Sequence, residues 1–296
     1  MRKLLALMIA VLLVLPAGLT ARATVPFAPG DIFVATGENG TVQVWRSDGT
    51  FKDVLLGTVP GSAEGLRFDS AGNLYVAHWC RDPFCLTGNT VEKFDPTGIP
   101  VGTFGGGYSC DPGTLAFDAA GNTYVGQASC SGSVLKFSAT GQPLGSYAVA
   151  GDRAGAFKVE LAPDGCTLFY TSWSAYVKRF DVCTNTQLPD FNLAPLDAAA
   201  QVRVLPDGGV LVATAPAIVR LDASGALVRT YGLDPSVQYW VGLDLVGDGT
   251  FWATDKNSSY GLPFQGRYVS RFDLATGAML QSFSTGTTVV DVVVMR

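Results

Sequence analysis

The chain has 296 residues, and its 20 Lys and Arg residues are outnumbered by 25 Asp and Glu residues, for a formal net charge of −5. An acidic chain with no basic run lacks the electrostatic surface that nucleic acid or anionic lipid requires. We therefore exclude nucleic acid from the expected partners.

The first 23 residues have the pattern of a secretory signal peptide. Arg2 and Lys3 precede an uninterrupted apolar run over residues 4–15, and Ala21-Arg22-Ala23 offers a small-x-small cleavage site. The apolar run is shorter than the roughly 20 residues of a membrane-spanning helix. We expect a secreted or periplasmic protein with no membrane span after signal removal, in which residues 24–296 form a single domain. Losing three basic residues and no acidic ones changes the net charge from −5 to −8.

A short phrase recurs along the rest of the chain at intervals of 41 to 49 residues. Its copies are "FDSAGNLYVA" (Gly72), "FDAAGNTYVG" (Gly121), "LAPDGCTLFY" (Gly165), "VLPDGGVLVA" (Gly208) and "LVGDGTFWAT" (Gly249), with a partial first copy, "APGDIFVAT" (Gly30). A second phrase follows each copy: "VQVWRSDG", "VEKFDPTG", "VLKFSATG", "VKRFDVCTN", "IVRLDASG" and "VSRFDLATG". Alternating apolar residues around Asp, Thr and Gly turns predict strand–turn–strand segments.

Each repeat therefore holds four short strands, and no segment after residue 23 has the periodicity of a helix. A repeat of this length with four strands is typical of a β-propeller blade. The first repeat lacks its innermost strand, while the chain ends on an apolar strand, Val289–Arg296, that would be an aggregation-prone edge if unpaired. We predict an all-β, six-bladed propeller with four antiparallel strands per blade, closed by the C-terminal strand, which completes the N-terminal blade.

The six cysteines all follow residue 23, and an even number in an exported chain favours three disulfides. A two-residue turn at Ser174-Ala175 would place Cys166 opposite Cys183 in one hairpin, so they form the clearest pair. The other four allow three connectivities, among which we favour Cys80–Cys85 and Cys110–Cys130. Only one close pair has a spacing near that of thiolate zinc sites, and nothing completes it.

Four charged residues stand at one repeat position, five residues before the turn glycine, on the innermost strands: Arg67, Glu160, Arg203 and Asp244. We expect them to meet in the central channel. Either they neutralise one another, as buried charges require, or Glu160, Arg203 and Asp244 coordinate a ligand. We favour mutual neutralisation, because paired charges near the axis need no ligand.

The repeated phrases resemble NHL-type repeats and the wider six-bladed, TolB-like propeller group over essentially all of residues 24–296. The resemblance implies the fold but no single function, since the group contains lactonases, lyases, esterases and binding modules. "LRFDSAGNLYVA" is also similar to phrases of the senescence-marker/gluconolactonase group, which implies a divalent cation held eight positions before each turn glycine. Here those positions hold Glu64, Gly113, Phe157, Ala200, Val241 and Val290. Only Glu64 matches, so Asp111 or Asp291 would have to substitute.

Other enzymes of this group use histidine: paraoxonase-like lactonases a pair, amidating lyases several on zinc, and streptogramin lyases a catalytic one. The chain has a single histidine, His78 in "AHWC", which excludes the multi-histidine zinc sites. No G-x-S-x-G motif supports a serine nucleophile. His78, Glu64, Asp111 and Asp291 are therefore the catalytic candidates, and they do not form a complete set.

In these families the loops that join the blades share a face with the loops between the second and third strands, and ligands bind there. Aromatic and charged residues gather in these loops. The expected ligand-binding face contains Trp79, Arg81, Tyr108, Trp173, Tyr239, Trp240, Asp255, Lys256 and Tyr260. Exposed aromatic rings beside polar groups suit recognition of a protein, peptide or carbohydrate, although such rings also serve merely to cap blade ends.

We therefore expect an exported propeller that works as a ligand-binding or interaction module, as a monomer and without a cofactor. The alternative is a divalent-metal-dependent hydrolase or lyase, gluconolactonase-like or streptogramin-lyase-like, with its site at the channel mouth. Under that alternative, calcium is the expected cation.

Overall fold

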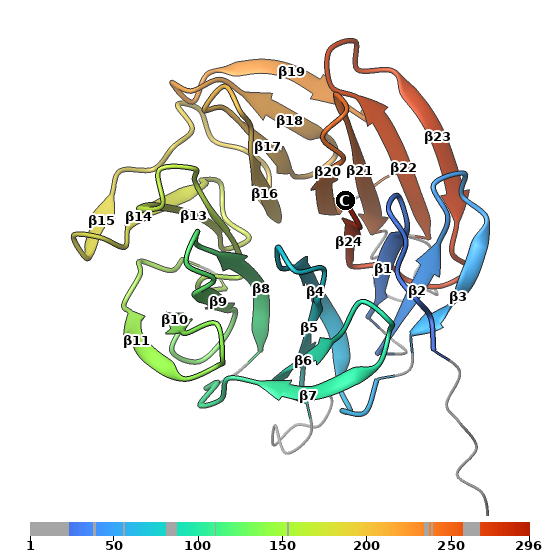
Figure 1. The fold of residues 1–296 in the computed structure, drawn as a ribbon. Coiled ribbons are helices and arrows are strands. Elements are labelled where there is room, and N and C mark those ends of the chain that lie inside the picture. The colour runs from blue at the N-terminus through green and yellow to red at the C-terminus, as the bar shows by residue number, and fades with distance from the viewer. Residues whose placement is uncertain are drawn as a thin grey trace, which may run out of the picture.

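The computed structural model describes residues 24–37, 40–55, 57–80, 88–109, 111–152, 154–233, 237, 239–256 and 267–296. Within these residues, 24 strands form six four-stranded sheets and there is no helix, hence none with the length and hydrophobicity needed to cross a bilayer. The sheets are arranged radially around a central axis, along which Figure 1 views the ring. We call the region between the innermost strands, which side chains fill, the central channel. The predicted six-bladed propeller is confirmed.

Each blade consists of four antiparallel strands that run in order from the channel to the rim. Blade 1 contains β24 (Asp291–Val294), β1 (Ile32–Thr36), β2 (Thr41–Trp45) and β3 (Phe51–Leu55); blade 2 contains β4 (Ser62–Phe68), β5 (Leu74–Trp79), β6 (Thr90–Phe94) and β7 (Pro100–Phe104); blade 3 contains β8 (Pro112–Phe117), β9 (Thr123–Gln127), β10 (Val134–Phe137) and β11 (Pro143–Tyr147).

The second half of the ring repeats this order. Blade 4 contains β12 (Lys158–Leu161), β13 (Thr167–Thr171), β14 (Lys178–Asp181) and β15 (Thr186–Leu188); blade 5 contains β16 (Gln201–Val204), β17 (Val210–Ala213), β18 (Ile218–Leu221) and β19 (Leu227–Tyr231); blade 6 contains β20 (Tyr239–Leu245), β21 (Thr250–Lys256), β22 (Tyr268–Asp273) and β23 (Met279–Ser284).

The C-terminal strand closes the ring. β24 pairs with β1 in antiparallel register, with Val34 opposite Val292, and becomes the innermost strand of blade 1. This is the closure predicted from the incomplete first repeat and the unpaired last strand. Figure 1 accordingly places the C-terminal end near the centre of the ring.

The repeated phrase is the turn between the innermost and second strands of a blade. In blade 2, the carboxylate of Asp69 accepts hydrogen bonds from the backbone N–H groups of Ala71 and Asn73. Gly72 has a φ of +79°, in the left-handed region where glycine has no Cβ to clash. Asp118 organises the same turn in blade 3. The phrase therefore recurs because six blades need the same turn.

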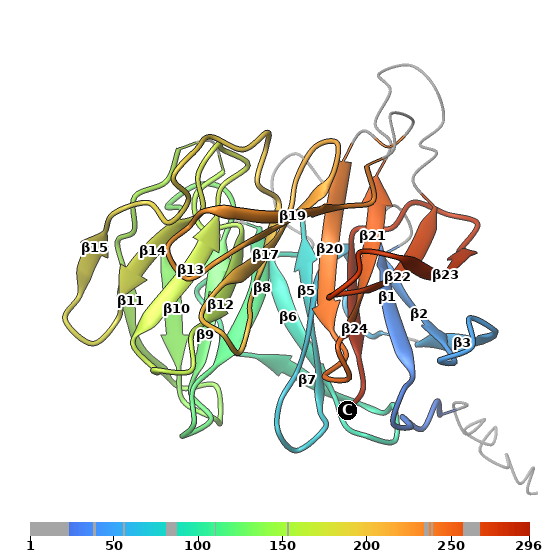
Figure 2. The same cartoon turned by 90° about the horizontal axis from the view of Figure 1, so that it is seen from above.

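The innermost strands define a channel with two ends. They all begin at one end, the upper mouth, and end at the other, the lower mouth; the edge-on view of Figure 2 shows the C-terminal end of β24 at the lower side. Near the upper mouth the strands approach closely. A Cβ atom on Gly65 would lie 1.9 Å from the carbonyl oxygen of Gly113, and one on Gly113 would lie 1.6 Å from that of Phe157. Glycine at these two positions lets the backbones meet.

The disulfide predicted between Cys166 and Cys183 is confirmed, with an S–S distance of 2.00 Å. The predicted register of its hairpin, with Cys166 opposite Cys183, was wrong by one residue: Thr167 pairs with Asp181, which aligns Cys166 with Val182. β13 and β14 are joined by residues 172–177 rather than by a two-residue turn, which shifts the pairing.

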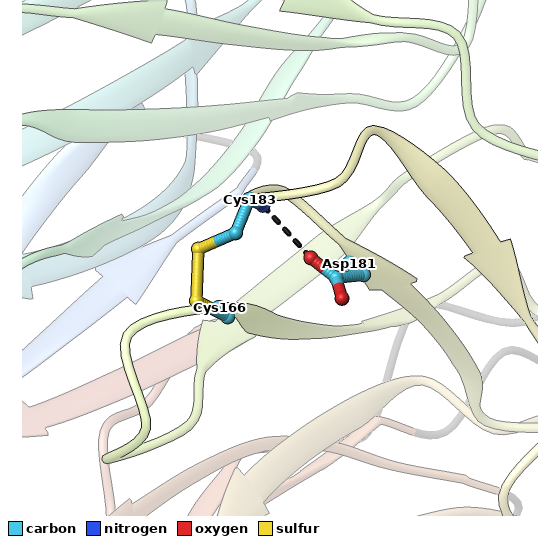
Figure 3. Close-up of side chains that lie close together, drawn as sticks. All are labelled: Cys166, Asp181 and Cys183. Carbon is cyan, nitrogen blue, oxygen red and sulfur yellow. Dashed lines mark hydrogen bonds between the residues drawn. A yellow bond between two sulfur atoms is a disulfide. The ribbon is translucent and has the colours of Figure 1, made fainter.

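Asp181 lies beside this disulfide, and its carboxylate accepts a hydrogen bond of 2.8 Å from the backbone N–H of Cys183 (Figure 3). Among the residues that the structure describes, these three are the only group of His, Cys, Asp and Glu side chains close enough to hold a metal ion. Because both sulfur atoms are already bonded to each other, neither is the thiolate that a metal would need.

Cys80 and Cys130 are also disulfide-bonded. Cys85 and Cys110 lie outside the described residues, so the pairings Cys80–Cys85 and Cys110–Cys130 stay predictions. The predicted signal peptide, residues 1–23, lies outside them as well.

Candidate functional site: the upper mouth of the channel

Four aromatic rings follow one another around the upper mouth. The ring centroids of Trp79 and Phe157 lie 5.4 Å apart, those of Phe157 and Trp173 5.8 Å, and those of Trp173 and Tyr239 5.8 Å. They come from blades 2, 4 and 6: the end of β5, the residue before β12, the loop after β13 and the start of β20. We call these four residues the upper-mouth arc.

Local structure fixes the rings of the arc. The indole N–H of Trp79 donates a 3.0 Å hydrogen bond to the carbonyl oxygen of Pro112. Trp173 has a φ of +54°, a left-handed conformation that is uncommon for a bulky residue and found most often where function demands it. Phe157 is only 4% exposed, whereas the other three rings are partly exposed. Phe157 therefore forms the base of the arc, and its neighbours offer open ring surface.

A buried lysine lies directly beneath the arc. The Nζ atom of Lys158 is 4.9 Å from the centroid of the Phe157 ring, donates a hydrogen bond of 2.5 Å to the carbonyl oxygen of Glu64, and lies 3.4 Å from Asp291 Oδ2. Burial lowers the pKa of Lys158, against the opposing effect of the Asp291 and Glu64 carboxylates. Burial also raises the pKa of Glu64, although the positive charges of Lys256 and Lys158 oppose it.

This arrangement does not suit a divalent cation. Of the residues expected under the metal-dependent alternative, Glu64 and Asp291 lie close enough for their charges to interact, but the ammonium group of Lys158 already faces both residues. The Asp291 carboxylate also accepts hydrogen bonds from the backbone N–H groups of Leu66 and Val292. A hard cation needs about six to eight oxygen ligands, and the equivalent positions of the other blades carry glycine or apolar side chains.

The four predicted channel charges come together deeper in the channel. Arg67 Nη2 lies 2.6 Å from Glu160 Oε2, Arg203 Nη1 lies 3.5 Å from the same oxygen, and Arg203 Nε lies 3.3 Å from Asp244 Oδ1. Burial lowers the pKa of Arg203, with Arg67 adding to the effect, whereas the pKa of Arg67 is raised because Glu160 and Asp244 outweigh burial. The contacts are those of charges that neutralise one another.

His78 lies away from the upper mouth, inside blade 2 and facing blade 1. Its side chain is 3% exposed, and Nε2 is 3.6 Å from Glu92 Oε2. The other oxygen of Glu92 accepts two hydrogen bonds of 2.6 Å from the backbone N–H and the hydroxyl of Thr58. The side chain of His78 is thus buried against Glu92 and does not belong to the arc.

The environment of Glu92 leads to a prediction of how the stability of the fold changes with pH. Burial raises the pKa of Glu92, but the nearby His78 side chain and the two hydrogen bonds from Thr58 outweigh this, so the pKa is held below the ordinary value of 4.5. A carboxyl whose folded-state pKa is depressed stabilises the fold above its unfolded-state pKa and loses that effect as the pH falls. We expect Glu92→Gln to cost about 2 kcal/mol at pH 7, because bonds to a charged acceptor are lost.

The measurement is urea denaturation of wild type and Glu92→Gln from pH 7 to pH 3. The difference in stability between the two proteins should shrink below about pH 4.5. A difference that stays constant over this range would show that the charge of Glu92 contributes nothing.

Two aromatic residues expected on the ligand-binding face pack against the blades, Trp240 fully and Tyr108 in part. Trp240 is 2% exposed, its indole N–H donates to the carbonyl oxygen of Gly232, and its ring contacts Phe272. The hydroxyl of Tyr108 donates to the carbonyl oxygen of Phe104, and burial raises the pKa of Tyr108. Neither ring belongs to the arc.

Some polar residues of the expected face accept hydrogen bonds from the backbone, whereas others are exposed at the surface. Asp255 is 4% exposed and accepts a hydrogen bond from the backbone N–H of Tyr268, and Asp111 accepts one from that of Cys80. Lys256 is partly exposed, and its charge acts on Glu64. Arg81 and Tyr260 lie outside the described residues.

Sequence reasoning missed three residues that matter here. Phe157 occupies the repeat position of Glu64, and Lys158 follows it. The alignment of the repeats therefore already placed both residues at the start of an innermost strand. Glu92 occupies a third-strand position that other blades fill with residues as different as Leu135 and Val219. The one signal in the sequence for a contact between Glu92 and His78 was a charged residue at a position that other blades do not fill with a carboxylate.

No family model matches the sequence, and no curated protein is similar to it. Among solved structures, the crystal structure at 1.35 Å resolution of a protein of unknown function from Bacteroides caccae is similar, with a TM-score of 0.72. The match covers 91% of this chain and 100% of that chain at 12% sequence identity. At this level of identity the similarity extends to the fold alone.

Proposed function

We propose that this protein is an exported ligand-binding module whose ligand is held at the upper mouth of the channel. The observation that carries the proposal is the upper-mouth arc, a row of four neighbouring rings of which three are partly exposed and one, Phe157, is buried. Aromatic side chains with fixed geometry are the usual anchors of recognition sites. The protein, peptide or carbohydrate that binds would present an apolar group or a sugar ring to the arc.

The channel beneath the arc supports binding rather than chemistry. Lys158 and Asp291 are paired at its upper end, and the deeper carboxylates face arginines. Because these charges are buried and matched, they would hold the blades together rather than act on a substrate.

Two further features support export and kinship. The disulfide between Cys166 and Cys183 is typical of an oxidising compartment, in keeping with the signal peptide predicted over residues 1–23. We also propose that the chain belongs to the NHL-repeat, TolB-like group of propellers, on its repeated turn phrases.

The test is a screen of the purified protein against glycan and peptide arrays, followed by calorimetric titration of each bound compound. We expect Trp79→Ala and Trp173→Ala to weaken binding by about ten-fold or more, because each removes exposed ring surface at the centre of the site. Phe51→Ala is the matched control, since Phe51 is a half-exposed ring on the outer strand β3.

Wild-type affinity in both tryptophan variants would overturn this placement of the site. The titrations are run in calcium and in chelator. Binding that requires calcium would instead favour the metal-dependent hydrolase or lyase.

A further inference from the structure

The lower mouth of the channel opens into a cavity of about 530 Å³. Its walls come from the ends of β4, β8 and β24 and from the turn at residues 69–72. Figure 2 shows this side of the ring, where the C-terminal end lies. A volume of this size is in the range of small-molecule sites, and it lies at the opposite end of the channel from the arc.

Guanidinium groups outnumber carboxylates in the group of side chains around Asp244. Asp69 also lines the cavity, but its carboxylate lies 3.6 Å from Lys93 Nζ. Three guanidinium groups, those of Arg67, Arg203 and Arg296, surround two carboxylates, those of Glu160 and Asp244. Asp244 Oδ1 lies 3.1 Å from Arg296 Nη2, 3.3 Å from Arg203 Nε and 3.8 Å from Arg67 Nη1. An arginine stays charged in proteins, so this group of side chains carries one surplus positive charge.

The surplus charge faces the cavity. The side chain of Arg203 is 2% exposed and lies behind the mouth, whereas Arg67 and Arg296 line the cavity with exposures of 19% and 57%. The separation of 3.8 Å between Arg67 Nη1 and Asp244 is longer than a hydrogen bond. The hydrogen bonds that Arg296 makes to described residues all come from Nη2. Both guanidinium groups therefore have N–H donors to offer a ligand.

The remaining wall of the cavity is partly apolar. Phe68, Phe117 and Met295 line it and are each partly exposed. Both phenylalanine rings are held by edge or tilted contacts, Phe68 against Phe33 and Phe117 against Tyr75. A bare inorganic ion would use only the guanidinium groups and leave this wall in contact with water.

We propose that the lower mouth binds a small organic acid. Its carboxylate is held by Arg67 and Arg296, and its apolar body packs against Phe68 and Phe117. Guanidinium and carboxylate match in geometry and charge, and the ligand supplies an acceptor for the remaining N–H donors of Arg67 and Arg296. This site is independent of the arc, so either site can fail without the other.

The test is calorimetric titration with sodium benzoate, compared with benzamide, which lacks the charge, and acetate, which lacks the apolar body. We expect benzoate to bind at least about ten-fold more tightly than either compound, because benzamide cannot form the ion pairs with the arginines and acetate cannot pack against the phenylalanines. Arg296→Gln should weaken benzoate binding by about ten-fold. Arg296 is exposed, so this variant is expected to keep the fold, which its melting curve checks.

Arg229→Gln is the matched control, because Arg229 is an exposed arginine on the outer strand β19 that donates to the carbonyl oxygen of Thr276. It should bind benzoate as wild type does. The absence of benzoate binding, equal binding of benzamide, or wild-type affinity in Arg296→Gln would each overturn the proposal. Phosphate or acetate binding as tight as that of benzoate would overturn the role of the apolar wall.

Discussion

Replacing Lys158 with methionine is expected to lower the free energy of unfolding by about 3–5 kcal/mol. Lys158 is 1% exposed and Asp291 is fully buried, with Nζ and Oδ2 3.4 Å apart. Without the ammonium group, the carboxylate of Asp291 would lose its partner in a site closed to water, and the carbonyl oxygen of Glu64 would lose a donor. Urea denaturation at pH 7 measures the loss.

A surface pair supplies the matched control. Arg220 lies 2.5 Å from Asp207, but the two side chains are 25% and 50% exposed, so Arg220→Met should cost less than about 1 kcal/mol. Adding Asp291→Asn to Lys158→Met should recover part of the loss, because asparagine keeps the acceptor for Leu66 without the charge. Equal costs for Lys158→Met and Arg220→Met would contradict the role of the buried pair.

Removing the disulfide of blade 4 is expected to cost about 3 kcal/mol. Cys166 and Cys183 are 17 residues apart, and a cross-link over a loop of that length removes much of the conformational freedom of the unfolded chain. The measurement is the urea midpoint of the double variant Cys166→Ser/Cys183→Ser.

Cys183→Ser alone is the comparison variant, since it also breaks the bond but leaves one thiol. The two variants should be destabilised alike. A midpoint equal to that of wild type would mean that the strand pairs of blade 4 hold this hairpin without the cross-link.

The fold could be predicted because each blade repeats the same local chemistry. Asp69 and Gly72 build one turn, and the recurrence of that turn every 41 to 49 residues fixes the blade length and number. The first repeat lacked an innermost strand and the last strand lacked a partner, so pairing these two segments was the one arrangement that completed both. Local signals and the closure of the ring pointed to the same architecture.

The same periodicity also predicted which charged side chains lie in the channel. Arg67, Glu160, Arg203 and Asp244 share one repeat position, and a shared position on equivalent strands means a shared direction, toward the axis. Which of these charges touch could not be predicted, because that depends on the diameter of the channel.

The upper face was harder to predict, because its loops do not repeat. Trp173 and Trp240 look alike in sequence, yet Trp173 reaches the arc from a left-handed backbone and Trp240 packs between blades. His78 likewise turns inward because Glu92 and Thr58 lie on the neighbouring surfaces. Contacts between blades join residues from different repeats, and a repeat alignment contains no information about them.

The pairing of β24 with β1 also makes closure of the ring depend on the end of the chain. Five blades are continuous in the chain, but blade 1 is split between the two ends of the domain. Until residues 291–294 arrive, β1 and β20 both lack their neighbour at the channel, and Lys158 lacks Asp291. The ring therefore cannot close before the last strand is in place, and closure brings together strands with the largest sequence separation in the protein, the kind of contact that slows folding most.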